Sequence, residues 1–339
     1  MIRTTLLICA LFLPIATSAP LQLELISVDR IWDKAPHSAF GDIIRFEGKW
    51  FCVFREAGSH VSAPGRVDDG KLRVIVSKDG SHWDSAALIA EPGIDLRDPH
   101  LSIATGGRLM IVAGGSEYPE GQYRGRQSRV LFSSNGTDWS APHPVLEQGH
   151  WLWRVTWHKG RAYGVSKYGW TSKETPGNTR RVDLVTSADG IKWTKIVELK
   201  VPGGDETTVR FLPDGRMAAL MRNTLSDGDE AMIGVASPPF TEWQWSKSAH
   251  FVGGPNFIVL PSGAIVAGGR FYSRGPRLQP RTAIGPMTLD SYEPVLMLPS
   301  AGDSSYPGFA WHDGVLWTLY YSSHESRTSI YLAKIRVKP

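Results

Sequence analysis

Polar and ionisable residues recur at matching places in six segments of this 339-residue chain. Each segment has two apolar stretches joined by a glycine turn, and the polar residues stand where the first stretch begins and where the second ends. The beginnings carry His37-Ser38, Arg97-Asp98-Pro99, Trp153-Arg154, Asp205-Glu206, Pro255-Asn256 and Ser305-Tyr306. The ends carry Arg55-Glu56, Ser116-Glu117, Lys167-Tyr168, Arg222-Asn223, Gly269-Arg270 and Ser323-His324-Glu325. Polar residues with a purely structural role have no reason to fall at one repeat position, so we favour a functional pocket where these ends meet.

Two of these residues, Tyr306 and Glu206, suit covalent chemistry. A phenol has an ordinary pKa of about 10, so a tyrosine nucleophile needs a base and cationic surroundings. Glu206 offers the base. Arg55, Arg222 and Arg270 offer guanidinium groups, which bind a carboxylate through two hydrogen bonds. A neutral nucleophile suits a sugar whose reacting carbon carries a carboxylate, because an Asp or Glu nucleophile would be repelled.

A seven-residue turn motif, Ser-x-Asp/Asn-Gly-x-x-Trp, is the first sign of the framework that positions them. It occurs as SKDGSHW, SSNGTDW and SADGIKW, from Ser77, Ser133 and Ser187, and in a degenerate form as SPPFTEW from Ser237. Successive copies start 56, 54 and 50 residues apart. Asp or Asn followed by Gly supplies the positive φ of a hairpin turn, beneath which the Trp packs. We name these copies Asp-box turns and predict a structural role for them.

Six β-hairpins with a glycine in the turn give a second register of the same period. The turn glycines are Gly48, Gly107, Gly160, Gly215, Gly263 and Gly314, spaced 59, 53, 55, 48 and 51 residues apart. A repeat of about 50 residues with about four strands is typical of a propeller blade. The sequence therefore predicts an all-β, six-bladed β-propeller with four antiparallel strands in each blade.

The ring is predicted to close through the two ends of the chain. The last blade has three strands after Tyr306, ending with residues 329–337, and residues 21–28 offer the fourth. Their pairing would hide both sheet edges, which an open stack would leave exposed. In each blade the glycine hairpin joins the two inner strands and the Asp-box turn joins the outer two. The Asp-box turns are therefore expected on the face opposite the pocket.

Residues 1–18 have the features of a signal peptide, which leaves residues 19–339 as the propeller domain. Arg3 precedes an apolar stretch from Leu6 to Ile15, and small residues follow. This stretch is too short to span a bilayer, so we expect a secreted or periplasmic protein. Cys52 is the one cysteine left after cleavage, which excludes an intrachain disulfide, and its apolar neighbours predict a buried side chain.

Composition and motif content exclude several other classes of protein. A hydrophobic content of 42% excludes a disordered chain. The formal charge is +4, and the chain has no run of Lys or Arg of the kind that follows nucleic acid. The histidines lack metal-ligand spacing, and no HExxH, paired CxxC or glycine-rich phosphate loop occurs. We expect no metal and no cofactor, a glycan as the partner, and a monomer.

The Asp-box turns, the six units and the order of the polar residues together resemble the sialidase (neuraminidase) superfamily, glycosidases that use a tyrosine nucleophile. The matching residues, in chain order, are Asp98-Pro99, Glu206, Arg222, Arg270, Tyr306 and Glu325. The resemblance covers nearly all of the chain after the signal peptide. It implies an exo-acting glycoside hydrolase that releases a terminal acidic sugar, sialic acid foremost, with retention of configuration.

The resemblance also implies individual roles. Tyr306 would be the nucleophile and Glu206 its partner. Arg222 and Arg270 would bind the carboxylate of the sugar, and Glu325 would steady these arginines.

The general acid and one arginine are less well matched. The family places an Asp on the overhanging loop of the first blade as the acid, where this chain has Asp68 and Asp69, with Asp98 as the competitor. Sialidases usually begin the first blade with Phe/Tyr-Arg-Ile-Pro, whereas this chain has residues 37–40, His-Ser-Ala-Phe, and no arginine.

Arg97 or Arg154 could replace the missing arginine, and His37 and Asn256 complete the candidate substrate-binding residues. The missing arginine leaves two alternatives open. One is a hydrolase or lyase for another acidic sugar, such as a uronic acid. The other is a noncatalytic glycan-binding propeller, against which the presence of both Tyr306 and Glu206 argues.

Overall fold

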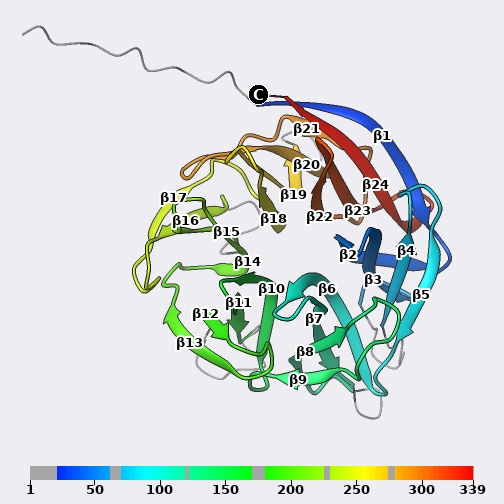
Figure 1. The fold of residues 1–339 in the computed structure, drawn as a ribbon, viewed down its shortest axis with the longest axis horizontal. Coiled ribbons are helices and arrows are strands. Elements are labelled where there is room, and N and C mark those ends of the chain that lie inside the picture. Colours follow the sequence, from blue (N-terminus) through cyan, green and yellow to red (C-terminus); the bar gives the residue numbers. More distant parts are fainter. Residues whose placement is uncertain are drawn as a thin grey trace, which may run out of the picture.

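The computed structural model describes residues 21–61, 70–118, 122–169, 180–224, 230–273 and 279–338. These residues form strands β1 to β24, arranged as six blades of four strands around a central axis (Figure 1). The predicted all-β, six-bladed propeller is confirmed. The predicted signal peptide, residues 1–18, lies outside the described residues. Within the described ranges, no helix is long and apolar enough to cross a membrane.

Each blade is an antiparallel sheet whose first strand lies nearest the axis (Figure 1). The first blade contains β2 (His37–Phe46), β3 (Lys49–Ala57), β4 (Lys71–Ser77) and β5 (Asp84–Ile89). The second contains β6 (Ile94–Ala104), β7 (Arg108–Glu117), β8 (Gly125–Ser133) and β9 (His143–Val145). The third contains β10 (His150–His158), β11 (Arg161–Tyr168), β12 (Arg181–Ser187) and β13 (Trp193–Glu198). The fourth contains β14 (Gly204–Phe211), β15 (Met217–Asn223), β16 (Met232–Ala236) and β17 (Gln244–Lys247). The fifth contains β18 (Gly253–Val259), β19 (Ile265–Ser273), β20 (Gln279–Met287) and β21 (Leu296–Met297). The sixth contains β22 (Ser304–His312), β23 (Val315–Glu325), β24 (Arg327–Lys338) and β1 (Gln22–Trp32).

The ring closes as predicted, with the N-terminal strand completing the last blade. β1 runs antiparallel to β24, from the pair Gln22 and Lys338 to the pair Trp32 and Ile330. Figure 1 shows the two strands side by side at the outer edge. This pairing joins the two ends of the chain and leaves neither of their strands unpaired in the sixth blade.

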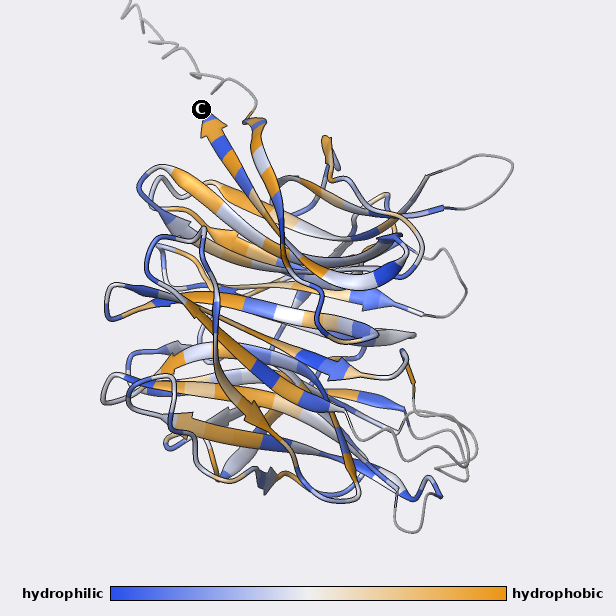
Figure 2. Ribbon diagram, turned by 90° about the vertical axis from the view of Figure 1, so that its right-hand side faces the viewer, coloured by the Kyte–Doolittle hydropathy of each residue, from blue (hydrophilic) through white to orange (hydrophobic). Residues whose placement is uncertain are grey.

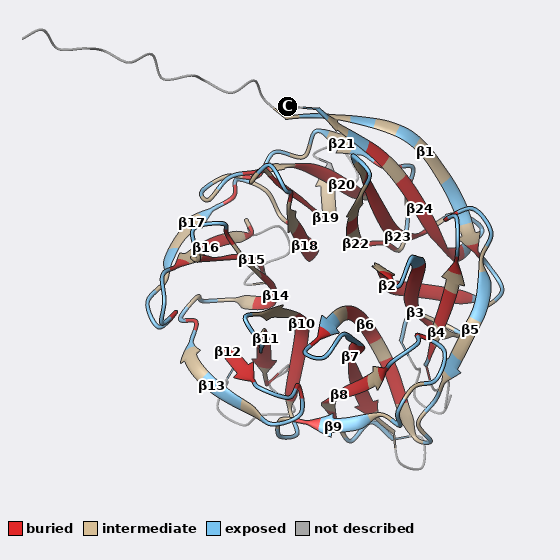
Figure 3. Cartoon of the chain, viewed as in Figure 1, coloured by how far each residue is buried: buried red, intermediate tan, exposed pale blue. Residues whose placement is uncertain are grey.

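The core lies between neighbouring blades rather than in one central mass. Five clusters of buried apolar residues each combine side chains from two adjacent blades, and a sixth joins the first and sixth blades and also includes Trp151 and Trp153 of the third. Buried residues gather in the inner strands, and exposure rises toward the outermost strand of each blade (Figure 3). Cys52 is fully buried in the cluster between the first and sixth blades, as predicted, and burial raises the pKa of its thiol.

Each face of the ring carries a different set of strand ends and turns. The strands run between these faces, with apolar and polar residues alternating along them (Figure 2). The Asp-box turns join the third and fourth strands and share one face with the glycine hairpins, as predicted. The opposite face receives the beginning of each first strand and the end of each second strand. We name it the mouth face.

Candidate active site at the centre of the ring

A β-bulge interrupts the first strand of every blade close to the mouth face. The shifts in register fall at Phe40-Gly41, Asp98-Pro99, Trp153-Arg154, Asp205-Glu206, Gly254-Pro255 and Tyr306-Pro307. Four of these residues have positive φ angles: Phe40 at 60°, Asp98 at 49°, Gly254 at 58° and Tyr306 at 56°. Bulges redirect side chains, and a positive φ in a residue other than glycine is strained. The repeated irregularity explains why residues from different blades meet at the centre.

The central contact joins Tyr306 and Glu206, from blades two apart in the ring. The Tyr306 hydroxyl donates a hydrogen bond of 2.8 Å to Oε1 of Glu206. The other carboxylate oxygen, Oε2, accepts hydrogen bonds from Nη1 of Arg222 at 3.1 Å and from the backbone N–H of Gly254 at 3.0 Å. Glu206 is 4% exposed and Tyr306 is 7% exposed, so both groups act in surroundings that contain little water.

The environment assigns opposite protonation states to the two partners. Burial raises the pKa of Tyr306 well above its ordinary value, and the nearby charge of Glu206 raises it further, so the phenol is neutral. Burial alone would also raise the pKa of Glu206. The charges of Arg222 and Lys167 and the hydrogen bond from Tyr306 outweigh burial and lower this pKa below 4.5. At neutral pH the pair is therefore a phenol beside an ionised carboxylate, which is the state a base requires.

Aromatic rings enclose the Tyr306 side chain. Its ring centroid lies 5.1 Å from that of Phe40, 5.5 Å from that of Trp153 and 5.9 Å from that of Tyr321. The guanidinium carbon of Arg270 lies 5.9 Å from the same centroid. These contacts hold the phenol in one orientation.

Asp98 supplies a second carboxyl group to the site. It is 8% exposed, and its Oδ1 is buried without a hydrogen-bond partner among the described residues. Burial raises the pKa of Asp98, Arg97 lowers it and Glu206 raises it, with a net rise. A carboxyl group of raised pKa beside a nucleophile is a candidate proton donor. Asp68 and Asp69, the other predicted candidates, lie outside the described residues.

Three of the predicted arginines surround the pair. Arg222 contacts Glu206, as described above. Arg270 donates from Nε to the backbone carbonyl of Ser304 at 3.0 Å and from Nη2 to the Tyr321 hydroxyl at 3.0 Å. Arg97 comes from the second blade, and its guanidinium carbon lies 5.1 Å from the Phe40 ring. Their side chains are 23%, 15% and 14% exposed, respectively, so each retains access to a ligand.

Two other predicted arginines, Arg55 and Arg154, are buried and paired with carboxylates of the protein. Arg55 is fully buried, with Nε and Nη2 bound to the Asp95 carboxylate at 2.7 and 3.0 Å and Nη1 bound to the Ser59 carbonyl. Arg154 is 2% exposed and binds Oδ2 of Asp42 at 2.7 Å. Both guanidinium groups are already occupied by protein carboxylates. They stabilise the framework beneath the site, and of the two proposed substitutes for the missing arginine only Arg97 remains.

Asn256 and Glu325, two further residues predicted to bind the substrate, form hydrogen bonds with other residues of the protein. Asn256 is 1% exposed, donates to the carbonyl of Pro307 and accepts from Arg210. Glu325 is 49% exposed and accepts hydrogen bonds from Arg30 and Tyr331. It therefore pairs with the N-terminal strand and does not contact the central arginines, because its place at the end of β23 turns it outward.

Asp303 makes the contact with a central arginine that the sequence analysis assigned to Glu325. It lies just before β22, and its Oδ1 accepts from the Tyr321 hydroxyl at 3.0 Å and lies 3.5 Å from Nη2 of Arg270. Its Oδ2 is bound by His37 Nε2 at 3.0 Å and His60 Nδ1 at 2.5 Å. Sequence reasoning missed both Asp303 and His60, because neither stands at a repeated position; the closeness of Asp303 to Tyr306 in sequence was the one available signal.

The same three groups are the candidates for holding a metal ion. The ligand atoms of His37, His60 and Asp303 lie within 4.8 Å of one another. However, the charge of Arg270 faces the same carboxylate, and both imidazoles already bind one of its oxygens. A second cation would be repelled there, so the arrangement fits a hydrogen-bonded His–Asp cluster better than a metal site.

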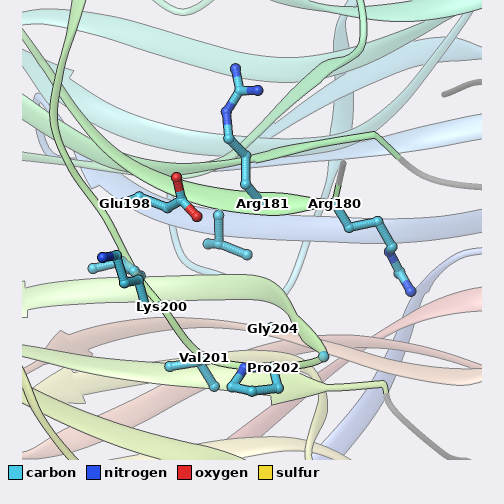
Figure 4. A pocket seen from close by; sticks show the side chains of 10 residues that line it. Arg180, Arg181, Glu198, Lys200, Val201, Pro202 and Gly204 are labelled. Carbon is cyan, nitrogen blue, oxygen red and sulfur yellow. The ribbon is translucent and has the colours of Figure 1, made fainter. Parts of the chain in front are cut away.

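A cavity of about 380 Å³ lies between the third and fourth blades, along the segment that joins β13 to β14. It is lined by residues 180–182 and 198–204, among which Arg180, Arg181 and Lys200 are basic (Figure 4). Nη2 of Arg180 lies 3.5 Å from Oδ2 of Asp205. Asp205 binds Lys167 and accepts from the backbone N–H of Glu206, so one residue that lines the cavity contacts a residue that supports the base.

Comparison with solved structures shows that this fold is shared. A protein of unknown function from Dyadobacter fermentans superposes with a TM-score of 0.77 at 19% identity, over 93% of this chain and 99% of that one. A Trypanosoma rangeli sialidase bound to sialic acid gives 0.64 at 14% identity, over 94% of this chain but 59% of the sialidase. A Fusarium graminearum α-L-arabinofuranosidase gives 0.65 at 14% identity, over 92% and 98%.

Neither a protein-family model nor a curated protein sequence matches this chain. At the identities above, the structural likeness shows the fold alone. That fold is a six-bladed β-propeller, which this chain shares with the sialidase and the arabinofuranosidase.

Proposed function

We propose that this protein is an exo-acting glycoside hydrolase of the sialidase type, which releases a terminal acidic sugar from a glycan. The observation that carries the proposal is the hydrogen bond of 2.8 Å between the Tyr306 hydroxyl and Glu206. A neutral phenol beside an ionised carboxylate, with Arg97, Arg222 and Arg270 around it, suits attack on an anomeric carbon that bears a carboxylate group. The structural likeness to a sialidase and an arabinofuranosidase supports the same reaction class.

The proposed reaction proceeds in two displacements. In the first, the Tyr306 oxygen bonds to the anomeric carbon, its proton passes to Glu206, and the glycosidic oxygen leaves with a proton from an acid group. In the second, water attacks the same carbon and gives a proton back to the acid group, the bond to Tyr306 breaks, and the phenolate recovers its proton from Glu206. Two inversions at one carbon give net retention.

The substrate is proposed to carry a carboxylate, with sialic acid as the first choice. Arg222 contacts Glu206, Arg270 lies over the Tyr306 ring, and Arg97 comes from the second blade. Three guanidinium groups are therefore available even though the first blade supplies no such arginine. Phe40 stands in that first-blade region and packs on Tyr306. This apolar replacement favours a second candidate, a terminal uronic acid. The basic cavity beside Asp205 offers room for the rest of the glycan.

The cellular setting belongs to the same proposal. Export through residues 1–18 would place the enzyme outside the cytoplasm, where glycans of other cells and of the surroundings are accessible. We propose that it acts there as a monomer without a cofactor.

A substrate panel tests the proposal. The purified protein is incubated with aryl α-sialosides, aryl uronides and aryl α-L-arabinofuranosides, and the released chromophore is measured. Release from the sialosides, with the α-anomer as the first product by NMR, is the expected result. Release from the uronides alone would identify the second candidate. Binding of sialylated glycans without any turnover would overturn the enzymatic proposal in favour of a glycan-binding propeller.

A further inference from the structure

His60 stands on the mouth face in the loop that follows β3, and a carboxylate fixes its ring. Its Nδ1 lies 2.5 Å from Oδ2 of Asp303, a residue 243 positions away in the chain. When Nδ1 donates to that carboxylate, the lone pair or proton of Nε2 points away from Asp303. The His60 side chain is 46% exposed, so the imidazole is accessible to a ligand on this face.

Asp303 is held in place from several sides and stays ionised. Burial alone would raise the pKa of Asp303, but hydrogen bonds from His37 and His60 and the charge of Arg270 lower it below its ordinary range. The Tyr321 hydroxyl binds the second oxygen at 3.0 Å. A fixed carboxylate against Nδ1 sets the tautomer of an imidazole and stabilises its protonated form, as in catalytic His–Asp pairs.

A single aromatic ring separates this imidazole from the nucleophile. His60 packs edge-on against Phe40, with ring centroids 5.0 Å apart, and Phe40 packs edge-on against Tyr306 at 5.1 Å. The charge of His60 also acts on Asp98, whose pKa it lowers. His60 therefore stands on the same side of the ring as the groups that surround the anomeric carbon in the proposed reaction.

We propose that His60 is the acid and base that exchanges protons with the leaving group and with water, and that Asp303 is its positioning residue. This inference rests on the glycosidase function proposed above. As the bond between the anomeric carbon and the glycosidic oxygen breaks, Nε2 of His60 gives its proton to that oxygen while Tyr306 bonds to the carbon. In the second displacement, Nε2 takes a proton from the attacking water, which restores the imidazolium.

Asp303 is proposed to act on the reaction through the orientation of the imidazole, because its Oδ2 fixes Nδ1 of His60. Asp303→Asn weakens this contact and should lower kcat/KM on alkyl glycosides in the same direction as His60→Ala, but by a smaller factor.

Leaving groups of graded basicity test the inference. A proton donor matters little when the leaving phenol is acidic and matters greatly when an alkyl alcohol leaves. We expect His60→Ala to lower kcat/KM by about 100-fold or more on alkyl glycosides, but only a few-fold on the dinitrophenyl glycoside of the same sugar. A residue with a structural or binding role would lower kcat/KM on both substrates alike.

His82 provides a matched control on the opposite face. Its Nδ1 lies 3.2 Å from Oδ2 of Asp79, and its side chain is 91% exposed, so His82→Ala removes a similar His–Asp pair far from the mouth and should change neither rate. Asp98→Asn compares the competing acid. A dependence on leaving-group basicity in Asp98→Asn but not in His60→Ala would overturn the inference.

Two further outcomes are decisive. Loss of wild-type activity after dialysis against EDTA, restored by Zn²⁺, would identify the His37, His60 and Asp303 cluster as a metal site and overturn the inference. A wild-type protein that cleaves none of the glycosides would overturn the proposed function and the role of His60 together. An active wild type with an unaffected His60→Ala would overturn the inference alone.

Discussion

The two faces of the ring repeat different things. On the Asp-box face the chain repeats side chains: in three turns a Ser hydroxyl accepts from the Gly N–H, and the Asp79, Asn135 or Asp189 side chain accepts from two further N–H groups. On the mouth face it repeats only the backbone bulge, and each bulge carries different residues. In the Asp-box turns the side chains only satisfy backbone N–H groups, and the same residue types recur. At the mouth face the same backbone bulge presents a different side chain in each blade, as a site for chemistry requires.

The two faces also differ in whether their carboxylates are exposed or buried. Carboxylates of the Asp-box turns are exposed and bind their own backbone, and these hydrogen bonds lower the pKa of Asp189. Beneath the mouth, carboxylates are buried against arginine or lysine, as in the pairs of Arg55 with Asp95 and Arg154 with Asp42. Burying such a pair contributes little net stability. Their concentration at one face therefore points to a site rather than to a stability device.

Removal of the Tyr306 hydroxyl should cause the largest loss of activity of any change at the mouth face. Tyr306→Phe deletes the proposed nucleophile and keeps the ring that packs on Phe40 and Trp153. We expect kcat to fall by roughly a thousandfold or more, with an unchanged melting temperature. Glu206→Gln should do similar damage, and the double variant should be no worse than either single one, because the two residues act as a unit. Full activity of Tyr306→Phe would exclude the nucleophile.

Two glycines of the fifth blade compare the faces directly. A Cβ at Gly254, where φ is +58°, would lie 2.5 Å from the Tyr306 ring, whereas a Cβ at the hairpin residue Gly263, where φ is +85°, would meet nothing within 4 Å. Gly254→Ala should therefore displace Tyr306 and lower kcat by about 100-fold.

Gly263→Ala, the control, strains the backbone alone, by roughly 1–2 kcal/mol. Its kcat should equal that of the wild type, while its melting temperature falls. Equal kcat values for the two alanine variants would contradict the placement of Gly254 beneath the phenol. Thermal denaturation of both variants separates lost catalysis from lost fold.

Arg222→Ala should affect both the affinity and the acid limb of the pH profile. Loss of a charged hydrogen-bond donor is expected to raise KM by roughly tenfold to a hundredfold. Glu206 must be ionised to take the Tyr306 proton, and Arg222 is the group that most lowers its pKa. Without Arg222 this pKa rises, so activity should disappear at a higher pH as the solution is acidified. An unchanged KM and acid limb would show that Arg222 has a structural role.

The sequence was sufficient for the ring and for the central pair. Period and turn chemistry are local properties, so Gly263 and its five counterparts, and the closing strand β1, could be placed without coordinates. Tyr306 and Glu206 were found because they stand at equivalent positions of two blades, which the bulges then bring together.

The partners of the charged residues could not be predicted in the same way. Asp42 and Arg154 are 112 residues apart, and each stands at a repeat position that resembles the others. Which arginine faces a ligand and which faces a carboxylate depends on the side-chain directions set by each bulge. Glu325 was assigned the contact with the arginines through the resemblance, which places a glutamate after the tyrosine, but in the structure it is Asp303 that contacts Arg270.

The smallest expected effect lies in an Asp-box turn and involves no change in activity. Asp189 accepts hydrogen bonds of 2.8 Å from the N–H groups of both Ile191 and Lys192, and Asn135 makes the equivalent bonds in the preceding blade. Asp189→Ala should lower the free energy of unfolding by about 1 kcal/mol, whereas Asp189→Asn should keep most of it. Because the folded pKa of Asp189 lies below its ordinary value of 3.8, its contribution is present above that pH and is lost as pH falls through the folded pKa. Urea denaturation at pH 7 and pH 3 should therefore show the difference between wild type and Asp189→Asn shrinking in acid, with kcat equal in all three proteins. A fall in kcat for either variant would show that the two faces are coupled, contrary to the structural role assigned to these turns.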